Sequence, residues 1–148
     1  MYGKILVATD DSELAKKAVL TGSQLAKQFG ADLVIVTVTE PLPPIDAAAE
    51  AEIGATDPFG RYEELAERRA SQSLAAAERI ANDAGITCRK IHVKDASPAV
   101  GIIETAANTG ADLIVMASHG RRGLTKLLLG SVTNEVLVTS QVPVLVCR

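Results

Sequence analysis

Residues 112–132 of the chain read DLIVMASHGRRGLTKLLLGSV. The apolar run at 113–116 is typical of a parallel strand that is buried on both faces. A polar loop with two glycines and two arginines follows it, and Gly130-Ser131 marks the expected start of a helix. The N–H groups and dipole at a helix start favour an anion, and glycine lets an anion approach the backbone closely. The stretch therefore predicts either an anion site or an ordinary strand-to-helix loop with solvated arginines.

Apolar strands and amphipathic helices alternate on both sides of this stretch. Strands are expected at 4–9, 32–38, 86–93, 113–116 and 143–147, and helices at 14–29, 61–84, 98–109 and 132–140. This order predicts one α/β domain over residues 1–148, a doubly wound parallel sheet of five strands with helices on both faces. The most apolar strands should be central and the more alternating strand at 86–93 should be an edge, which gives the strand order 3-2-1-4-5.

The segment at 39–60 differs from the rest of the chain. It contains Pro41, Pro43, Pro44 and Pro58 and has no clear hydrophobic period. It is also longer than the usual connection between elements. We therefore expect a long flexible loop that acts as a lid, a partner surface or a mobile segment.

Composition excludes several classes of protein. The net charge of −3 argues against a general nucleic-acid binder, which usually carries a basic face. No apolar run approaches the roughly 20 residues of a membrane span, and the N-terminus lacks the layout of a signal peptide. Cys88 and Cys147 both fall in expected strands and have no CxxC spacing, so they are interpreted as small core residues in a reducing cytoplasm.

A ligand site is expected at the carboxyl edge of the sheet, where the strand order reverses. Polar residues follow two of the central strands at that edge, Thr9-Asp10 after the first and 117–120 after the fourth. The chain has no GxxxxGK[ST], which excludes a P-loop NTPase, and no GxGxxG after the first strand, which argues against an ordinary dinucleotide fold. A receiver domain is disfavoured as well, because the last strand has no lysine to accompany Asp10-Asp11 and Asp95.

The pattern A-S-H-G, nine further residues, then G-S at 117–131 resembles the loop of the universal stress protein family, in its ATP-binding branch. That family's loop is G-two-G-nine-G-[S/T]. The opening KILVATDDS and the closing GSVTNEVL and VPVLV support the match, so the resemblance covers the whole chain, with 40–60 least characteristic. One departure is Ala117 at the first glycine position, where one added methyl should perturb phosphate contacts only slightly.

The resemblance implies bound ATP, with or without magnesium. Asp10 would bond the ribose hydroxyls, or else only cap the following helix, and the backbone of Val38 would meet the adenine edge. Gly120, Gly130 and Ser131 would bind phosphates, with Ser131 also capping its helix. The full set of residues expected to bind the nucleotide is Thr9, Asp10, Val38, Met116, Ala117, His119, Gly120, Arg122, Gly130, Ser131, Val132 and Thr133.

The resemblance also implies a function. It suggests a cytoplasmic homodimer, paired through the strand at 143–147, that acts as a nucleotide-dependent stress or signalling module with an unknown protein partner. Two alternatives stay open: a slow ATPase or phosphotransferase that uses the same pocket, and a dimeric interaction module that has lost the nucleotide. We expect little hydrolysis, because His119 is the only obvious base in the loop and has no acidic partner in the motif. No catalytic residue and no protein metal ligand is predicted.

Overall fold

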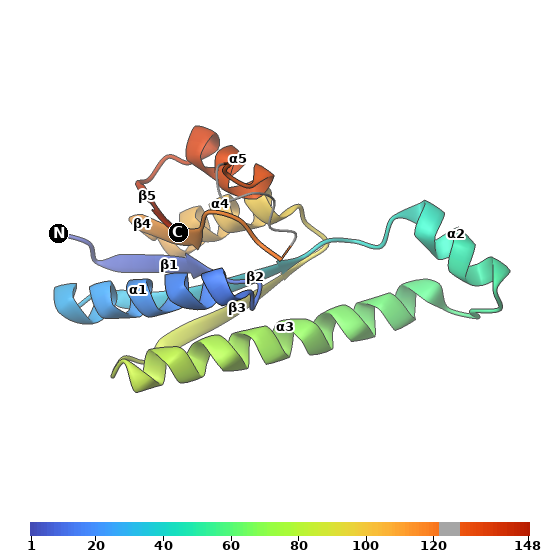
Figure 1. Cartoon of the computed structure of the whole chain (residues 1–148), viewed down its shortest axis with the longest axis horizontal. Helices are drawn as coiled ribbons and strands as arrows, with labels where there is room; N and C mark the ends of the chain where they lie inside the picture. Colours follow the sequence, from blue (N-terminus) through green and yellow to red (C-terminus); the bar gives the residue numbers. More distant parts are fainter. Residues whose placement is uncertain (122–127) are drawn as a thin grey trace.

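The computed structural model describes residues 1–121 and 128–148, and in this part of the chain five parallel strands form one sheet (Figure 1). The strands are β1 (Lys4–Ala8), β2 (Asp32–Thr39), β3 (Cys88–Lys94), β4 (Leu113–Ala117) and β5 (Val144–Cys147). Their order is β3-β2-β1-β4-β5, with every neighbouring pair parallel. The predicted order is thus confirmed, and β3 and β5 are the two edges.

Helices cover both faces of the sheet. They are α1 (Glu13–Phe29), α2 (Pro44–Glu52), α3 (Pro58–Asp83), α4 (Pro98–Thr109) and α5 (Ser131–Thr139). Figure 1 shows α1 and α3 on one side of the sheet and α4 and α5 on the other. Among the helices of residues 1–121 and 128–148, none has the length and apolar character needed to cross a membrane.

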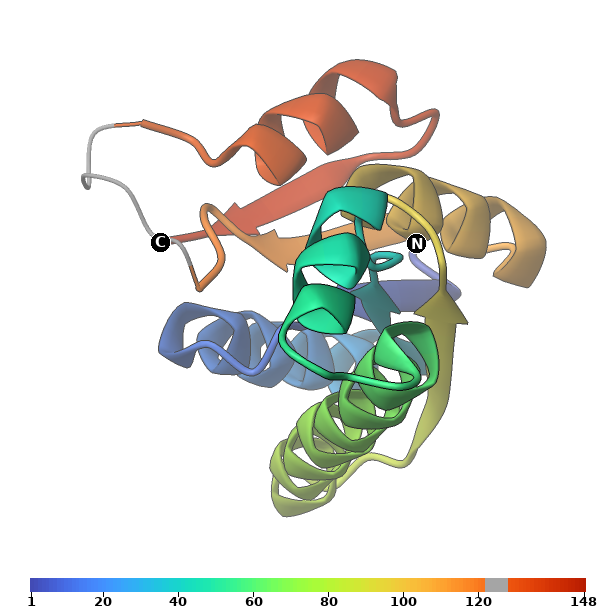
Figure 2. The ribbon, with the colours of Figure 1, turned by 90° about the vertical axis from the view of Figure 1, so that its right-hand side faces the viewer.

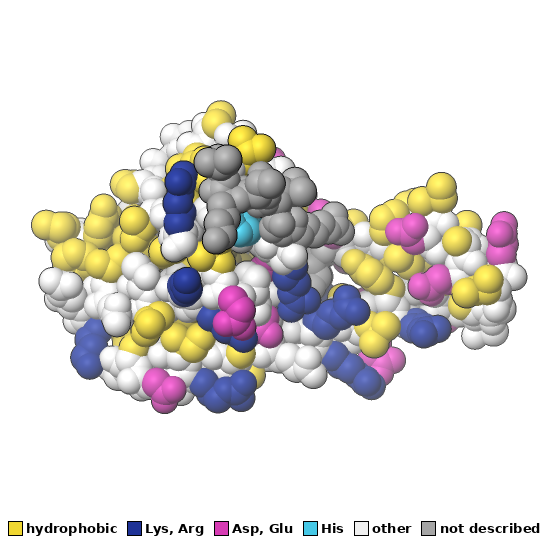
Figure 3. Space-filling view, viewed as in Figure 1, with side chains coloured by type: hydrophobic (Ala, Val, Ile, Leu, Met, Phe, Trp, Pro, Cys, Tyr) yellow, Lys and Arg dark blue, Asp and Glu magenta, His cyan; other side chains and the backbone are white. Residues whose placement is uncertain are grey.

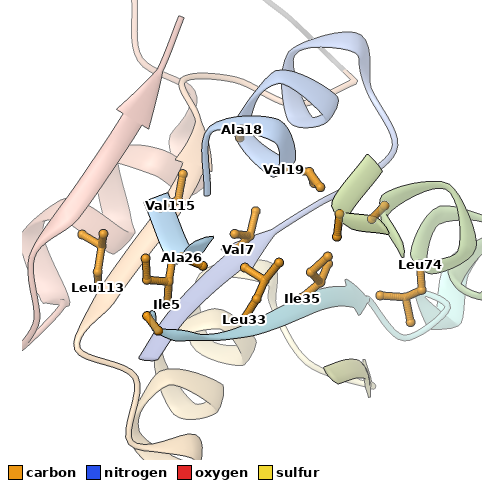
Figure 4. Close-up of a cluster of buried hydrophobic side chains, with 13 residues drawn as sticks. Ile5, Val7, Ala18, Val19, Ala26, Leu33, Ile35, Leu74, Leu113 and Val115 are labelled. Carbon is orange, nitrogen blue, oxygen red and sulfur yellow. The ribbon is translucent and has the colours of Figure 1, made fainter. Parts of the chain in front are cut away.

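Alternate residues of the central strands fill two separate cores. Ile5 and Val7 of β1 pack under α1 and α3, in the cluster drawn in Figure 4. Leu6 and Ala8 point to the opposite face, where they pack against α4 and α5. This alternation is the period of two that a strand imposes, and it explains why strands buried on both faces have no polar residues in their middle.

The 39–60 segment, expected to be a long loop, contains the helix α2, and α3 begins at Pro58 rather than at residue 61. The prolines were the misleading feature. Pro44 and Pro58 occupy the first turns of α2 and α3, where the missing N–H costs nothing and the fixed φ suits a helix. Asp57 completes the second start by accepting a hydrogen bond from the Gly60 N–H at 3.1 Å.

Helix α2 has little hydrophobic pattern because it buries almost nothing. Ala47 is its one buried side chain, with 4% of its surface exposed. The helix contacts α3 and lies beyond the carboxyl edge of the sheet, as Figures 1 and 2 show from two directions. The carboxyl edge is therefore flanked by an arm that the sequence did not predict, formed by α2 and the first turns of α3.

Candidate functional site

A pocket of about 160 Å³ opens at the carboxyl ends of β1, β2 and β4. Its apolar walls include Ala8, Val36, Ile102 and Met116. The residues of the predicted set that line it are Thr9, Asp10, Val38, Met116, Ala117, His119, Gly120, Val132 and Thr133. The expected convergence of the loops after β1 and β4 is therefore present in the structure.

Two described residues of the predicted set do not line the pocket. Gly130 and Ser131 are at the start of α5 but are not among the pocket-lining residues. Arg122 lies outside the described residues. The pocket wall thus comes from strand ends and from the second and third residues of α5, with the start of the helix beside it.

Sequence reasoning missed five lining residues, namely Ala8, Ala15, Val36, Pro98 and Ile102. All five are apolar. Four are buried like ordinary core residues, and Pro98 lies in the first turn of α4. Ile102, for example, lies on the buried side of α4 and is 4% exposed. A signal was available only in position, since Ala8 and Val36 come near the ends of neighbouring parallel strands.

Asp10 joins the loop after β1 to the loop after β4. Its Oδ1 accepts the Ser12 N–H at 3.0 Å, and its Oδ2 accepts the Arg121 N–H at 3.0 Å. The Arg121 Nε also donates to the Asp10 carbonyl oxygen at 2.7 Å. An ionised carboxylate offers about four lone-pair sites, so Asp10 keeps capacity to accept a further donor. Helix α1 is capped by the Ser12 hydroxyl, which accepts from the Ala15 N–H at 3.1 Å, so capping α1 is not the role of Asp10.

The start of α5 is fixed against the end of β4. The Gly130 N–H donates to the Ser118 carbonyl oxygen at 2.8 Å, and the Thr133 hydroxyl donates to the Ala117 carbonyl oxygen at 2.8 Å. Gly130 holds the N-cap position, and no side chain of residues 1–121 or 128–148 caps the helix. The prediction that Ser131 is the N-cap was therefore wrong, because the helix begins one residue earlier and Ser131 is its first residue. The first N–H groups of an uncapped helix remain available to an anion.

The structure shows why Gly120 and Gly130 of the loop motif have no room for a side chain. A Cβ at Gly120 would lie 2.5 Å from the Asp10 Oδ2, and one at Gly130 would lie 3.2 Å from the His119 Cα. Neither glycine has a positive φ, so the need is for close approach of the backbone and not for a left-handed conformation. Ala117 lies within β4, where an extended backbone accepts its methyl group.

His119 is half-buried beside the pocket, and its Nδ1 lies 3.1 Å from the Ser118 hydroxyl. A hydroxyl partner orients the ring, whereas the general bases of hydrolases are more often held by a carboxylate. Figure 3 shows the face of the molecule that is seen in Figure 1. On this face, basic side chains gather where the α2–α3 arm meets the body.

Comparison with known proteins identifies the family. The model of the universal stress protein family matches residues 1–148. The chain belongs to the universal stress protein family. A universal stress protein of Thermus aquaticus is 33% identical, with both chains covered in full. Stress response protein NhaX of Bacillus subtilis is 32% identical, over 98% of this chain and 97% of that protein.

Solved structures agree with the fold of this family member. The structure of hypothetical protein MJ0577 is 28% identical and has a TM-score of 0.78, covering 99% of this chain and 96% of that chain. A universal stress protein solved in complex with cAMP is 25% identical, with a TM-score of 0.75 and coverage of 99% and 97%. The predicted resemblance and the α/β fold are both confirmed.

Proposed function

We propose that this universal stress protein binds ATP and that its nucleotide-bound and free states signal to a protein partner. The observation that carries the proposal is the pocket at the carboxyl edge of β1, β2 and β4. It combines apolar walls with a polar rim, and it adjoins the uncapped start of α5. An adenine nucleotide has the matching parts, namely a flat apolar base, a sugar with hydroxyls and a chain of anions. A relative that is 25% identical was solved with cAMP, which supports an adenine-containing ligand.

The base would occupy the apolar part of the pocket, against Val36, Ile102 and the backbone of Val38. At about 160 Å³ the pocket is smaller than the roughly 300 Å³ at which ligand sites usually begin, so it would hold only the base and part of the sugar. The ribose hydroxyls would donate to the Asp10 carboxylate. This carboxylate already accepts N–H groups from the loop after β1 and from the loop after β4.

The phosphates would lie outside the pocket, over Gly120 and the start of α5. The N–H groups of Ser131, Val132 and Thr133 would donate to them, because the Gly130 N–H already donates to the Ser118 carbonyl oxygen. Gly130 would let the phosphates approach the backbone closely, and Arg122 would add positive charge. If magnesium accompanies ATP, phosphate oxygens and water would supply most of its ligands, as is usual for this ion. We do not expect rapid hydrolysis, because the hydrogen-bond partner of His119 is a hydroxyl.

The acting unit would be a cytoplasmic homodimer. Strand β5 is the outermost strand on its side of the sheet, and Leu145 in its middle is 37% exposed. Such an edge pairs readily with another chain. We propose that two β5 strands meet antiparallel about a two-fold axis.

The proposed ligand can be identified without choosing it in advance. Purified protein is denatured, and the released small molecules are analysed by mass spectrometry, with Asp10→Ala protein prepared in parallel. We expect ATP or ADP from the wild type and much less from the variant. If nothing is released and calorimetry with millimolar ATP gives no heat, the chain is a nucleotide-free interaction module instead.

A further inference from the structure

A second cavity lies next to the first, between the end of β2, α3 and α2. Its volume is about 370 Å³, which falls within the range of roughly 300–1,000 Å³ for small-molecule sites. Asp10, Val38 and Pro98 line both cavities and separate one from the other. No residue of the second cavity except Asp10 and Val38 belongs to the set expected to bind the nucleotide.

Two polar side chains of this cavity lack a partner. Ser73 on α3 is 4% exposed, and its hydroxyl makes no hydrogen bond with any described residue. The Oε2 of Glu50 on α2 is also buried and likewise has no partner in residues 1–121 and 128–148. Leaving a buried polar atom unsatisfied is costly, and most such atoms in folded proteins have partners. Both side chains line the cavity, so a bound molecule could satisfy them together.

The cavity also carries two arginines. Arg121 uses its Nε on the Asp10 carbonyl oxygen, which leaves its terminal nitrogens for other acceptors. Arg69 lines the cavity from α3 and forms no ion pair within the described part of the chain. The neighbouring Arg68 points elsewhere and pairs with Glu64 at 2.6 Å. A guanidinium group presents a fork of donors that matches a carboxylate.

We infer that this second cavity binds a small zwitterion, a molecule with a protonated amine and a carboxylate, such as a free amino acid. The amine donates to the Glu50 carboxylate, because a buried acceptor gains most from a charged donor. The carboxylate lies against Arg69 and Arg121, and the Ser73 hydroxyl makes a third hydrogen bond. An anion alone would leave Glu50 without a donor, and an amine alone would leave the arginines without an acceptor. The site does not depend on the proposed nucleotide, although it shares a wall with that pocket.

The test uses the full chain with a mixture of the common L-amino acids, in saturation-transfer NMR without nucleotide and again with saturating ADP. We expect signal transfer to at least one amino acid in both conditions. Titration of that amino acid then compares Arg69→Gln with Arg68→Gln, the matched change one residue away. Arg69→Gln should weaken binding about tenfold, since one charge-assisted hydrogen bond is lost, and Arg68→Gln should leave it unchanged.

A second pair of variants separates binding from folding. Ser73→Ala removes the unpartnered hydroxyl without adding volume, so it should raise the melting temperature while it weakens amino-acid binding. Ser71→Ala is the control on the same helix, because Ser71 is exposed and outside the cavity. Glu50→Gln should weaken binding, whereas Glu52→Gln at an exposed position should not.

Three results would overturn the inference. The first is the absence of signal transfer to any amino acid in either condition. The second is competition, in which ADP abolishes the transfer and so places the amino acid in the first pocket. The third is unchanged affinity in both Arg69→Gln and Ser73→Ala. Failure of nucleotide binding itself would appear separately, as ADP titrations without heat alongside intact amino-acid binding.

Discussion

At the scale of single residues, Asp10 links the conformation of the site to its proposed ligand. Its two carboxylate oxygens hold the N–H groups of Ser12 and Arg121, one from each loop at the pocket mouth. A ribose would therefore meet a carboxylate that is already fixed in place, and fixed groups lose little entropy on binding.

Asp10→Ala should weaken ATP and ADP by the same factor, about ten- to hundred-fold, because it removes a charge-assisted hydrogen bond to ribose and none to the γ-phosphate. Titration calorimetry with both nucleotides measures this. Asp11→Asn is the control, since Asp11 does not line the pocket and asparagine tolerates its φ of 64°. A loss confined to ATP would place the carboxylate near the phosphates and not the sugar.

Gly22 provides a test of the packing of α1. Its absent Cβ would lie 2.4 Å from Cγ2 of Val7, a fully buried and stiff side chain. Helix propensity alone predicts that Gly22→Ala stabilises the fold by about 0.5–1 kcal/mol. The clash should reverse the sign and destabilise it by about 1–3 kcal/mol.

Urea unfolding of Gly22→Ala decides between the two signs. Gln24→Ala, at an exposed position of the same helix, should change the free energy of unfolding by less than about 0.5 kcal/mol. A stabilised Gly22→Ala protein would mean that α1 does not pack this closely on β1.

Polar residues of the site could be predicted from sequence and apolar ones could not. Asp10, His119 and Gly120 interrupt apolar strands at their ends, where a core residue would be out of place. Val36 and Ile102 obey the period of their own strand and helix, so nothing in the sequence separates a pocket wall from a core wall. That distinction depends on how α4 packs over the ends of the strands.

At the scale of elements, the two edge strands differ in what they expose. β3 pairs with β2 along seven residues and is covered in part by α3, whereas β5 has four residues and carries the exposed Leu145. Val144 of β5 packs against the core under α4 and α5, so a charge there would damage the fold as well as any interface.

Leu145→Lys is therefore the clean test of the proposed dimer. We expect monomers in sedimentation, because a lysine at the edge opposes pairing of two identical strands. Ile53→Lys, which changes an 86% exposed residue beyond α2, should leave the assembly as it is in the wild type. A dimer that survives Leu145→Lys would place the interface away from β5.

His92, on the edge strand β3, predicts that the stability of the fold depends on pH. Burial, and then the positive charge of Lys94, lower the pKa of His92, while the Glu67 carboxylate acts in the opposite direction. The His92 Nε2 also lies 2.9 Å from the Thr39 hydroxyl. Since the folded state binds the proton less tightly than the unfolded chain, His92 contributes stability above its unfolded pKa of about 6.5, and this is lost as the pH falls through the folded pKa.

The urea concentration at the midpoint of unfolding should thus decrease as the pH is lowered from about 7 to about 5. His92→Gln should make this decrease smaller. Carboxylates contribute to acid destabilisation as well, so the informative quantity is the difference between wild type and variant. An identical pH dependence in both proteins would show that His92 is not responsible.

Helix α2 shows why the elements were only partly predictable. Strands buried on both faces and helices with one apolar face carry a clear period, and each of those was located to within a few residues. α2 has one buried residue, so its sequence has no clear hydrophobic period, and the prolines of this segment suggested a loop. Pro44 and Pro58 are in fact in the first turns of α2 and α3, where proline is favoured.

At the scale of the whole molecule, the ends of β1 and β4 lie beside each other, at the point where the order of the strands along the sheet reverses. This follows from the alternation of elements and could be predicted. The arm of α2 and α3 could not, although it walls the second cavity and so sets how much of the carboxyl edge is enclosed. The described chain therefore presents two adjoining cavities on one edge, with Asp10 between them.

We expect an adenine nucleotide to bind at this edge, against the start of α5. The most direct measurement is the NMR titration of backbone amide signals with ADP, because the proposed phosphate donors are themselves N–H groups. Saturable shifts are expected at Gly120, Ser131, Val132 and Thr133, with little change in the groove between α1 and α3 that contains Leu20 and Asp83. No saturable shift at millimolar ADP, or shifts centred on that groove instead, would contradict the account.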